Sequence, residues 1–166
     1  MIKLIVLDVD GTMTDGKITY SNSGEEFKSF CVKDGLAIAS WIRLGLNVAI
    51  ITGRESKIVE NRAKELGIKH FYQKIKDKDK KVEEILKDLS LDWSSVAVIG
   101  DDLNDYSMMK KASISFTPKN GVDFIKSKVD IIVAKNGGDG AIREMIEYLI
   151  KLNGMQKEFL NLWVKE

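Results

Sequence analysis

An apolar run near the start of the chain ends in two aspartates: the segment reads IKLIVLDVDGT over residues 2–12. The run from Ile2 to Leu7 is almost continuously apolar and rich in branched side chains, which is typical of a parallel strand covered on both faces. Three further runs share this character, at residues 48–51, 96–99 and 131–133. We therefore predict buried parallel strands at these four places.

Segments with helical spacing separate the predicted strands. Apolar side chains recur every three or four positions over residues 36–46, 58–66 and 82–89. Gly45 and Gly67 follow the last turns of the first two patterns, where glycine commonly ends a helix. Strands that alternate with helices indicate an α/β fold: a Rossmann-like, doubly wound, mainly parallel sheet with helices on both faces.

Two segments depart from this alternation. Residues 17–30 carry β-forming residues on both sides of Ser21-Asn22-Ser23-Gly24, which predicts a small β-hairpin inserted after the first strand. The tail, residues 154–166, contains Phe159 and Trp163 and is too apolar for a solvated terminus, so we expect it to pack against another surface. No repeat or linker divides the chain, and residues 1–166 fit a single domain.

Composition limits the partners and the compartment. Lys and Arg number 26 against 25 Asp and Glu, so the net charge of +1 gives no reason to expect a nucleic acid or an anionic membrane as partner. No apolar stretch reaches the roughly 20 residues of a membrane span, and the first apolar run is too short for a secretory signal. The single cysteine, Cys31, excludes an internal disulfide. We therefore expect a soluble, cytoplasmic protein.

Acidic residues follow two of the predicted strands. Asp8 and Asp10 follow the first, and Asp101, Asp102 and Asp105 follow the strand at 96–99. Ligands of α/β sheets bind at the carboxyl ends of strands. On an ideal strand Asp8 and Asp10 would share one face, and two carboxylates about 4 Å apart repel by roughly 4 kcal/mol at an effective dielectric of 20. So many oxygen ligands without histidine or cysteine favour Mg²⁺, although the later three aspartates alone are also typical of a helix cap.

A threonine and a group of lysines complete the candidate residues. Thr52-Gly53-Arg54 follows the strand at 48–51, where a hydroxyl and free backbone N–H groups form an anion pocket. Several lysines lie near the start of the helix at 82–89, where the helix dipole disfavours cations, so a functional lysine is plausible there. The candidates are Lys78, Lys80 and Lys81, and a solvated helix face is the alternative interpretation.

Four segments resemble, in this order, the motifs of the haloacid dehalogenase superfamily of aspartate-dependent phosphotransferases. They are residues 8–12, Thr52, the lysines near residue 78 and residues 100–105. A narrower resemblance, over nearly the full length, is to the 3-deoxy-D-manno-octulosonate 8-phosphate phosphatases, a branch without a cap domain. By its spacing from Gln73, Lys78 matches the family lysine best. The supporting residues are Thr14-Asp15-Gly16, Gly24-Glu25-Glu26, Lys33-Asp34-Gly35, Ile51-Thr52-Gly53-Arg54, Asp77-Lys78 and residues 137–144.

The resemblance implies an Mg²⁺-dependent phosphomonoester hydrolase that acts through an aspartyl phosphate. Asp8 would attack phosphorus, and Asp10 would protonate the leaving oxygen and later activate water. The transferring phosphoryl group would be held by Thr52, Gly53 and Lys78.

The resemblance also implies the metal ligands. Mg²⁺ would be bound by the carboxylates of Asp8 and Asp101 and by the main-chain carbonyl of Asp10. Asp105 and Asp102 would stand behind these ligands and orient them.

Substrate and assembly follow from the same resemblance. The implied substrate is a phosphorylated sugar acid of lipopolysaccharide precursor synthesis, whose carboxylate suits the donor fork of an arginine, Arg54 first and Arg62 second. Members of the branch are homotetramers assembled through the hairpin, and their tails can reach the neighbouring site. The alternatives are a 9-phosphate phosphatase of a nonulosonate sugar acid, a phospho-receiver domain and a non-catalytic tetrameric relative.

Overall fold

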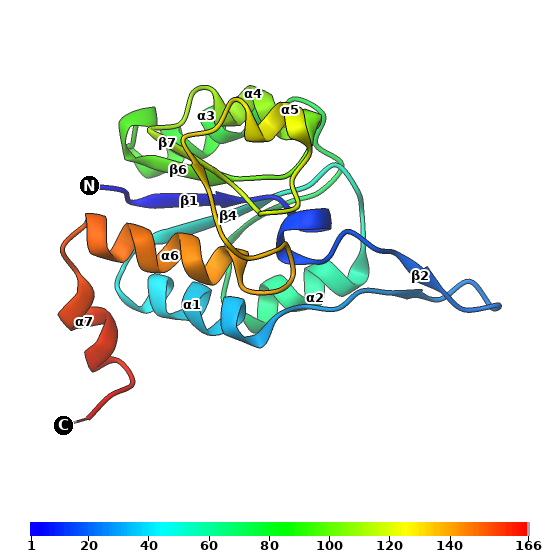
Figure 1. Ribbon diagram of the computed structural model, residues 1–166, viewed down its shortest axis with the longest axis horizontal. Helices are drawn as coiled ribbons and strands as arrows, with labels where there is room; N and C mark the ends of the chain where they lie inside the picture. Colours follow the sequence, from blue (N-terminus) through cyan, green and yellow to red (C-terminus); the bar gives the residue numbers. More distant parts are fainter. Residues whose placement is uncertain (166) are drawn as a thin grey trace.

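A six-stranded, fully parallel sheet forms the centre of the computed structural model, which describes residues 1–165 (Figure 1). The strand order is β5-β4-β1-β6-β7-β8, and every neighbouring pair is parallel. The strands are β1 (Leu4–Leu7), β4 (Asn47–Ile51), β5 (His70–Tyr72), β6 (Val96–Ile99), β7 (Ile114–Thr117) and β8 (Ile131–Ile132).

Helices cover both faces of the sheet, which confirms the doubly wound prediction (Figure 1). Ile5 and Leu7 of β1 pack with α1 (Val32–Arg43), α2 (Lys57–Glu65) and α6 (Ala141–Leu152). The alternate residues Leu4 and Val6 pack with α3 (Lys78–Leu89), α4 (Tyr106–Met109) and α5 (Asp123–Lys126). Because successive strand side chains point to opposite faces, the continuous apolar run serves two cores at once.

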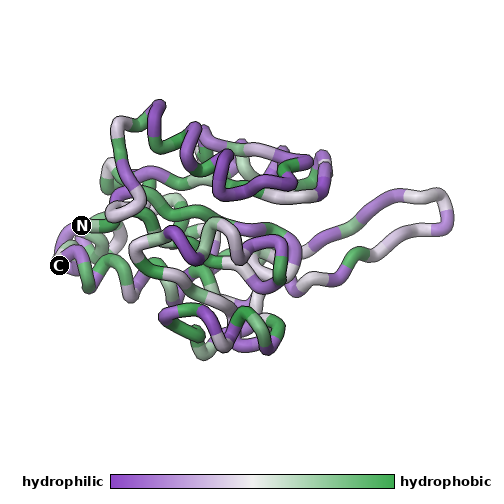
Figure 2. Tube along the Cα trace, turned by 90° about the horizontal axis from the view of Figure 1, so that it is seen from above, coloured by the Kyte–Doolittle hydropathy of each residue, from purple (hydrophilic) through white to green (hydrophobic). Residues whose placement is uncertain are grey.

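The inserted hairpin consists of β2 (Thr19–Tyr20) and β3 (Glu26–Phe27), which pair antiparallel. It projects away from the sheet as a long arm (Figures 1 and 2), so the predicted insertion after the first strand is confirmed. The remaining elements are the helical turns η1 (Val9–Met13), η2 (Trp93–Ser95) and η3 (Leu103–Asp105) and the short helix α7 (Gln156–Asn161).

Side chains of the tail pack on their own chain. Phe159 of α7 joins the core beneath α6, and the indole Nε1 of Trp163 donates to Ser40 Oγ at 2.8 Å. Leu160 and Val164 nevertheless stay half exposed. Within the described residues, no helix is long and apolar enough to cross a membrane.

The strand register brings the predicted site residues to one edge. Leu7 of β1 pairs with Ile50 of β4 on one side and Ile99 of β6 on the other. The residues that follow these three positions therefore emerge together at the carboxyl ends of the central strands. This edge is the one predicted for the acidic residues and for Thr52.

Candidate active site

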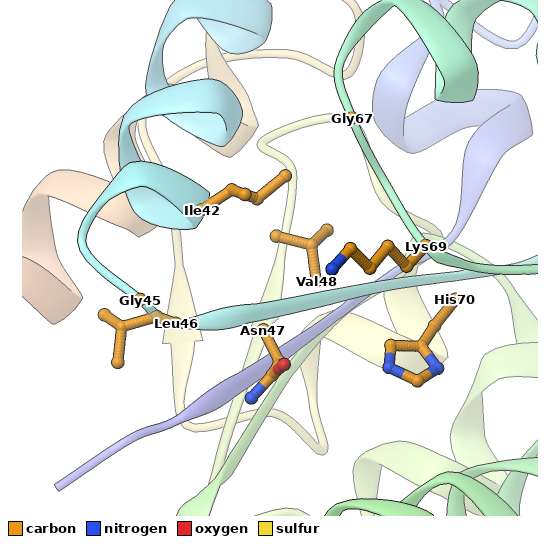
Figure 3. A pocket seen from close by; sticks show the side chains of 8 residues that line it. All are labelled: Ile42, Gly45, Leu46, Asn47, Val48, Gly67, Lys69 and His70. Atoms are coloured by element: carbon orange, nitrogen blue, oxygen red, sulfur yellow. The ribbon is translucent and has the colours of Figure 1, made fainter.

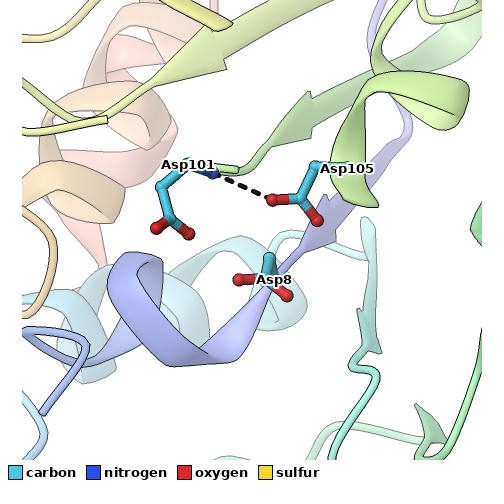
Figure 4. A group of neighbouring side chains, drawn as sticks. All are labelled: Asp8, Asp101 and Asp105. Atoms are coloured by element: carbon cyan, nitrogen blue, oxygen red, sulfur yellow. Dashed lines mark hydrogen bonds between the residues drawn. The ribbon is translucent and has the colours of Figure 1, made fainter. Parts of the chain in front are cut away.

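Three carboxylates meet at the carboxyl edge of the sheet (Figure 4). Asp8 follows β1, Asp101 follows β6, and Asp105 belongs to the turn η3. One oxygen from each lies within 4.8 Å of the others, and Asp8 and Asp105 are buried. The neighbouring positions of β1 and β6 therefore bring Asp8 next to two acids that lie 93 or more residues after it in the sequence.

A buried lysine ties two of these carboxylates together. Lys78, at the start of α3, donates from Nζ to Asp8 Oδ1 at 2.7 Å and to Asp105 Oδ1 at 2.6 Å, and its side chain is 0% exposed. A buried ammonium has to be paired, and this one has two partners. Lys80 is 72% exposed and Lys81 pairs with a glutamate of its own helix. Of the three candidate lysines, the structure brings only Lys78 to the acidic group.

Asp105 and Asp102 also serve the backbone of the loop. Asp105 Oδ2 accepts hydrogen bonds from the N–H groups of Asp101 and Asp102, at 2.9 and 3.2 Å, so both of its oxygens are engaged. Asp102 is exposed and accepts from the N–H of Leu103 at 2.7 Å, as a helix cap does. The capping interpretation therefore describes Asp102, whereas Asp101 turns into the acidic group and accepts from Thr12 Oγ1 at 3.1 Å.

The charge balance of the carboxylate group favours a bound cation. Burial, and then the charge of Asp105, raise the pKa of Asp8 well above its usual range, and Lys78 opposes this only in part. The same two causes raise the pKa of Asp101 to about 6. Burial lowers the pKa of Lys78, but the carboxylates of Asp8 and Asp105 outweigh it and raise that pKa. Three carboxylates beside one ammonium fit the oxygen-rich environment that Mg²⁺ prefers.

Asp10 departs from the ideal-strand expectation. The strand ends at Leu7 and the backbone enters the tight turn η1, so Asp10 does not lie on an ideal strand, and its carboxylate is not part of the group formed by Asp8, Asp101 and Asp105. Asp10 Oδ1 accepts instead from Nζ of Lys28, at 2.7 Å, at the root of the hairpin. Sequence reasoning missed Lys28, which directly follows β3; its only signal is its place two positions after Glu26, in the alternation typical of a strand.

Close backbone packing fixes the loop that carries these aspartates. Gly11 has φ +97°, and a Cβ there would lie 2.1 Å from Asp101 Oδ2. The loop before α6 closes from the other side: a Cβ on Gly137 would lie 1.8 Å from the carbonyl oxygen of Gly11, and the N–H of Gly138 donates to Thr12 O at 3.0 Å. Both loops approach too closely for side chains at these positions.

Thr52, Gly53 and Arg54 lie at the same edge, after β4. Thr52 is buried, and its Oγ1 accepts from the N–H of Arg54 at 3.4 Å. The side chain of Arg54 is exposed, and its Nη2 donates to the hydroxyl of Tyr20, on the hairpin, at 3.4 Å. The predicted anion pocket and the predicted sugar-acid arginine are therefore adjacent to one another and to the hairpin.

Arg62 has a different environment. Its guanidinium lies over the ring of Phe30, at 5.7 Å, and Nη1 contacts Glu65 Oε2 at 3.3 Å. It also fills the space in front of Gly35, where a Cβ would lie 2.4 Å from Nη2. These contacts hold α2 against α1 and the end of the hairpin, and none of them is to Asp8, Asp101 or Arg54.

A surface hollow at the amino ends of β4 and β5 lies on the opposite edge of the sheet (Figure 3). It is lined by side chains around Asn47 and His70, including Ile42 and Lys69. The acidic group follows the carboxyl ends of β1 and β6, so this hollow is separate from it. His70 accordingly takes no part in the candidate site.

Comparisons with known proteins agree with this geometry. Residues 70–146 match the family model of the haloacid dehalogenase-like hydrolases. The 3-deoxy-D-manno-octulosonate 8-phosphate phosphatase KdsC of Escherichia coli K12 is 38% identical over 157 residues, which is 95% of this chain and 84% of the relative.

Two solved structures are similar over most of the chain. The Moraxella catarrhalis 3-deoxy-D-manno-octulosonate 8-phosphate phosphatase, in complex with magnesium, phosphate and KDO, superposes with a TM-score of 0.92 at 40% identity, covering 97% of this chain and 93% of that one. The cobalt-bound Haemophilus influenzae enzyme gives a TM-score of 0.88 at 35% identity, covering 92% and 90%. Fold and site thus define a haloacid dehalogenase-like hydrolase. Within that class, the chain belongs to the family of the 3-deoxy-D-manno-octulosonate 8-phosphate phosphatases.

Proposed function

We propose that this chain is an Mg²⁺-dependent phosphatase that releases phosphate from 3-deoxy-D-manno-octulosonate 8-phosphate, in lipopolysaccharide precursor synthesis. The observation that carries the proposal is the buried ammonium of Lys78 between Asp8 and Asp105, beside Asp101. Such a group at the ends of central strands is suited to phosphoryl transfer, in which positioning and charge neutralisation dominate.

Asp8 is the proposed nucleophile. Lys78 engages Asp8 Oδ1, which leaves Oδ2 to attack phosphorus. As the new O–P bond forms, the bond from phosphorus to the sugar oxygen breaks, and the carboxyl group of Asp10 gives its proton to that oxygen. The products of this half-reaction are the free sugar acid and an aspartyl phosphate.

Hydrolysis of the aspartyl phosphate uses the same residues. The carboxylate of Asp10 takes a proton from water, whose oxygen attacks phosphorus, and the bond between phosphorus and the oxygen of Asp8 breaks. Inorganic phosphate leaves, Asp8 is regenerated as a carboxylate, and Asp10 is protonated again. Thr52, Gly53 and Lys78 hold the phosphoryl oxygens in both halves.

The proposed Mg²⁺ ligands are Asp8, Asp101 and the main-chain carbonyl of Asp10. When bound, the ion neutralises the crowded carboxylates and the phosphoryl oxygens and aligns the two for reaction. Asp105 supports this set, because its two oxygens already bind Lys78 and the backbone of the loop. Asp102, which is exposed, is the second residue proposed to support the metal ligands.

Arg54 is the proposed reader of the sugar carboxylate. It is exposed beside Thr52 and contacts the hairpin, so its planar donor fork is free to meet a carboxylate entering the site. Arg62 is the second residue proposed to contact the sugar acid, and its packing against Phe30 favours a role in supporting the site. A nonulosonate 9-phosphate is the alternative substrate, since it presents the same phosphate and carboxylate chemistry.

We also propose a single-domain subunit that assembles as a homotetramer through its hairpin and acts in the cytoplasm. Exposed Tyr20 and Phe27 on the hairpin support the assembly, and free Cys31 suits a reducing compartment. Entry of the tail into a neighbouring site belongs to the same proposal, supported by exposed Leu160 and Val164.

The nucleophile is tested with Asp8→Asn and the matched control Asp88→Asn, an exposed aspartate of α3. With Mg²⁺ and p-nitrophenyl phosphate, the wild type and the control release phosphate continuously, whereas Asp8→Asn gives no turnover and remains folded by circular dichroism. Turnover by the Asp8→Asn variant contradicts the assignment. Release of a single equivalent of p-nitrophenol by the wild type, with the phosphoryl group retained on the protein, contradicts the phosphatase and favours a phospho-receiver domain.

The substrate is tested by a screen of phosphorylated sugar acids that follows released phosphate. The octulosonate 8-phosphate is expected to give the highest kcat/KM. Arg54→Gln is expected to lower kcat/KM for this substrate about tenfold or more while changing p-nitrophenyl phosphate hydrolysis little, because a lost charge-assisted hydrogen bond is worth about 1.5–3 kcal/mol. Equal losses on both substrates would show that Arg54 does not read the carboxylate.

A further inference from the structure

A lysine of the hairpin is buried against the proposed acid–base residue. Nζ of Lys28 lies 2.7 Å from Asp10 Oδ1 and 3.3 Å from Glu26 Oε1, and the side chain of Lys28 is 0% exposed. Burying an ammonium is unfavourable unless it is paired, so these two carboxylates account for its place in the fold. The proposed chemistry gives no task to Lys28 itself.

The contact fixes one half of the Asp10 carboxyl group. Lys28 binds Oδ1, and Oδ2 makes no hydrogen bond within residues 1–165. The side chain of Asp10 is 20% exposed, so the group is open on one side and anchored on the other. A general acid works only when its proton lies within hydrogen-bond reach of the leaving oxygen, and a single fixed oxygen restricts the rotation of the carboxyl group.

The position of Lys28 in the hairpin makes this anchor possible. Glu26 and Lys28 are two residues apart and their charged ends lie 3.3 Å from each other, whereas Phe27 between them is exposed. The hairpin makes a second contact with the site through Tyr20, next to its turn: Nη2 of Arg54 donates to the hydroxyl of Tyr20 at 3.4 Å. The hairpin therefore touches both the proposed acid–base residue and the proposed substrate arginine.

We propose that Lys28 is a positioning residue for Asp10: its ammonium holds the carboxyl group in the orientation that protonates the leaving sugar oxygen. The inference rests on the proposed function and deepens it, because it makes the hairpin part of the catalytic apparatus of its own subunit. Lys28 acts through Asp10 and does not touch the substrate.

Two substrates with different leaving groups test the proposal. Lys28→Met keeps the apolar stem and removes the charge, and Lys17→Met, on the other arm of the hairpin, is the exposed control. For the octulosonate 8-phosphate, whose alkoxide needs a proton, Lys28→Met is expected to lower kcat/KM about tenfold or more, since general acid catalysis contributes about 10²–10⁴-fold. For p-nitrophenyl phosphate, whose phenolate leaves unprotonated, the expected loss is below about threefold. Lys17→Met changes neither value.

Two further variants separate positioning from support of the fold. Lys28→Arg retains a cation and is expected to recover most of the lost kcat/KM. Asp10→Asn combined with Lys28→Met is expected to be no worse than Asp10→Asn alone, because residues that act through one another are not additive. If Lys28→Met does not fold, Lys28→Gln replaces it, and the same larger loss of kcat/KM on the octulosonate 8-phosphate than on p-nitrophenyl phosphate is expected.

The outcomes are distinct. A wild-type chain that hydrolyses neither substrate refutes the proposed function, and the inference with it. An active wild type whose Lys28 variants lose equally on both substrates, or whose double variant is additively worse, overturns the positioning role and leaves the phosphatase intact.

Discussion

Lys78 shows how one residue serves both stability and chemistry. Its ammonium is fully buried between Asp8 and Asp105, so removing it leaves two carboxylates facing each other without a cation. Breaking a buried ion pair by deleting one partner costs about 3–5 kcal/mol, because the remaining charge stays desolvated. The same deletion also removes a proposed contact to the phosphoryl group.

We therefore expect Lys78→Met to abolish turnover and to lower the free energy of unfolding by about 3–5 kcal/mol, measured by urea denaturation at pH 7. Lys80→Met, on the exposed side of the same helix, is expected to stay within about 0.5 kcal/mol of the wild type and to remain active. If Lys80 rather than Lys78 proves essential, the assignment of the phosphate-site lysine is wrong.

The raised pKa values predict a pH-dependent response to metal removal. A carboxyl group whose pKa is raised on folding contributes stability that is present at low pH and lost as pH rises from about 4 through the folded-state pKa, here about 6 for Asp101. In EDTA, the Tm is expected to fall between pH 5 and 7. At pH 7, Mg²⁺ at about 100 times its Kd is expected to restore about 2.7 kcal/mol.

Asp101→Asn is the informative variant for this experiment. It removes one carboxylate from the buried group, so its metal-free form is expected to lose less stability between pH 5 and 7 and to gain less from Mg²⁺. A wild-type Tm that is indifferent to both EDTA and Mg²⁺ would remove the ion from the proposed mechanism.

At the residue scale, the sequence predicted those site residues whose positions follow from where the strands end. Asp8, Thr52 and Asp101 follow apolar runs, so their meeting at one edge follows from parallel strands. Asp10 and Lys28 were not paired in advance, because their contact depends on the turn η1 and on how the hairpin root lies, and no periodic pattern encodes either.

At the element scale, the loop before α6 supports the loop that carries the aspartates. Gly137 has an ordinary φ, so an alanine there would fit its backbone, but its Cβ would fall 1.8 Å from the carbonyl oxygen of Gly11. One of the two loops has to move. Since Gly11 itself approaches Asp101 closely, that movement reaches the proposed metal ligands.

Gly137→Ala is accordingly expected to reduce kcat more than tenfold and to lower the free energy of unfolding by about 1–3 kcal/mol, as overpacking does. Gly154→Ala is the control: with φ +70° and open space around it, it has a backbone cost of about 1 kcal/mol and no steric clash. Activity assays and thermal melts of both variants measure the difference. A fully active Gly137→Ala protein contradicts the supporting role of this loop.

The elements themselves were only partly predictable. Runs rich in β-branched residues predicted β1, β4, β6 and β8. The helices α1 and α2 end as expected at Gly45 and Gly67, which have φ +80° and +74°. The strands β5 and β7 were missed. The first is only three residues long, and the second contains Ser115, whose N–H and hydroxyl bind Asp130. Their strand character comes from pairing with neighbours, which a local pattern does not record.

At the scale of the whole molecule, exposed apolar side chains lie on the projecting hairpin. Tyr20 and Phe27 are 59% and 50% exposed, on an arm that extends beyond the sheet and its helices (Figure 2). Two short strands are marginal on their own in water, so contacts at its root and a partner surface in the proposed assembly would stabilise the arm. The proposed homotetramer supplies that surface.

Sedimentation of the wild type is therefore expected to give a tetramer, and Phe27→Asp is expected to shift it to smaller species by placing a charge in the interface. Leu152→Asp is the control, since this exposed leucine ends α6, away from the hairpin (Figure 1). If the Phe27 variant dissociates yet retains kcat/KM, the contacts of Lys28 and Tyr20 within one subunit are sufficient for the site. If activity falls with dissociation, neighbouring subunits complete it. A wild type that sediments as a monomer contradicts the assembly, and the exposed hairpin then needs another partner.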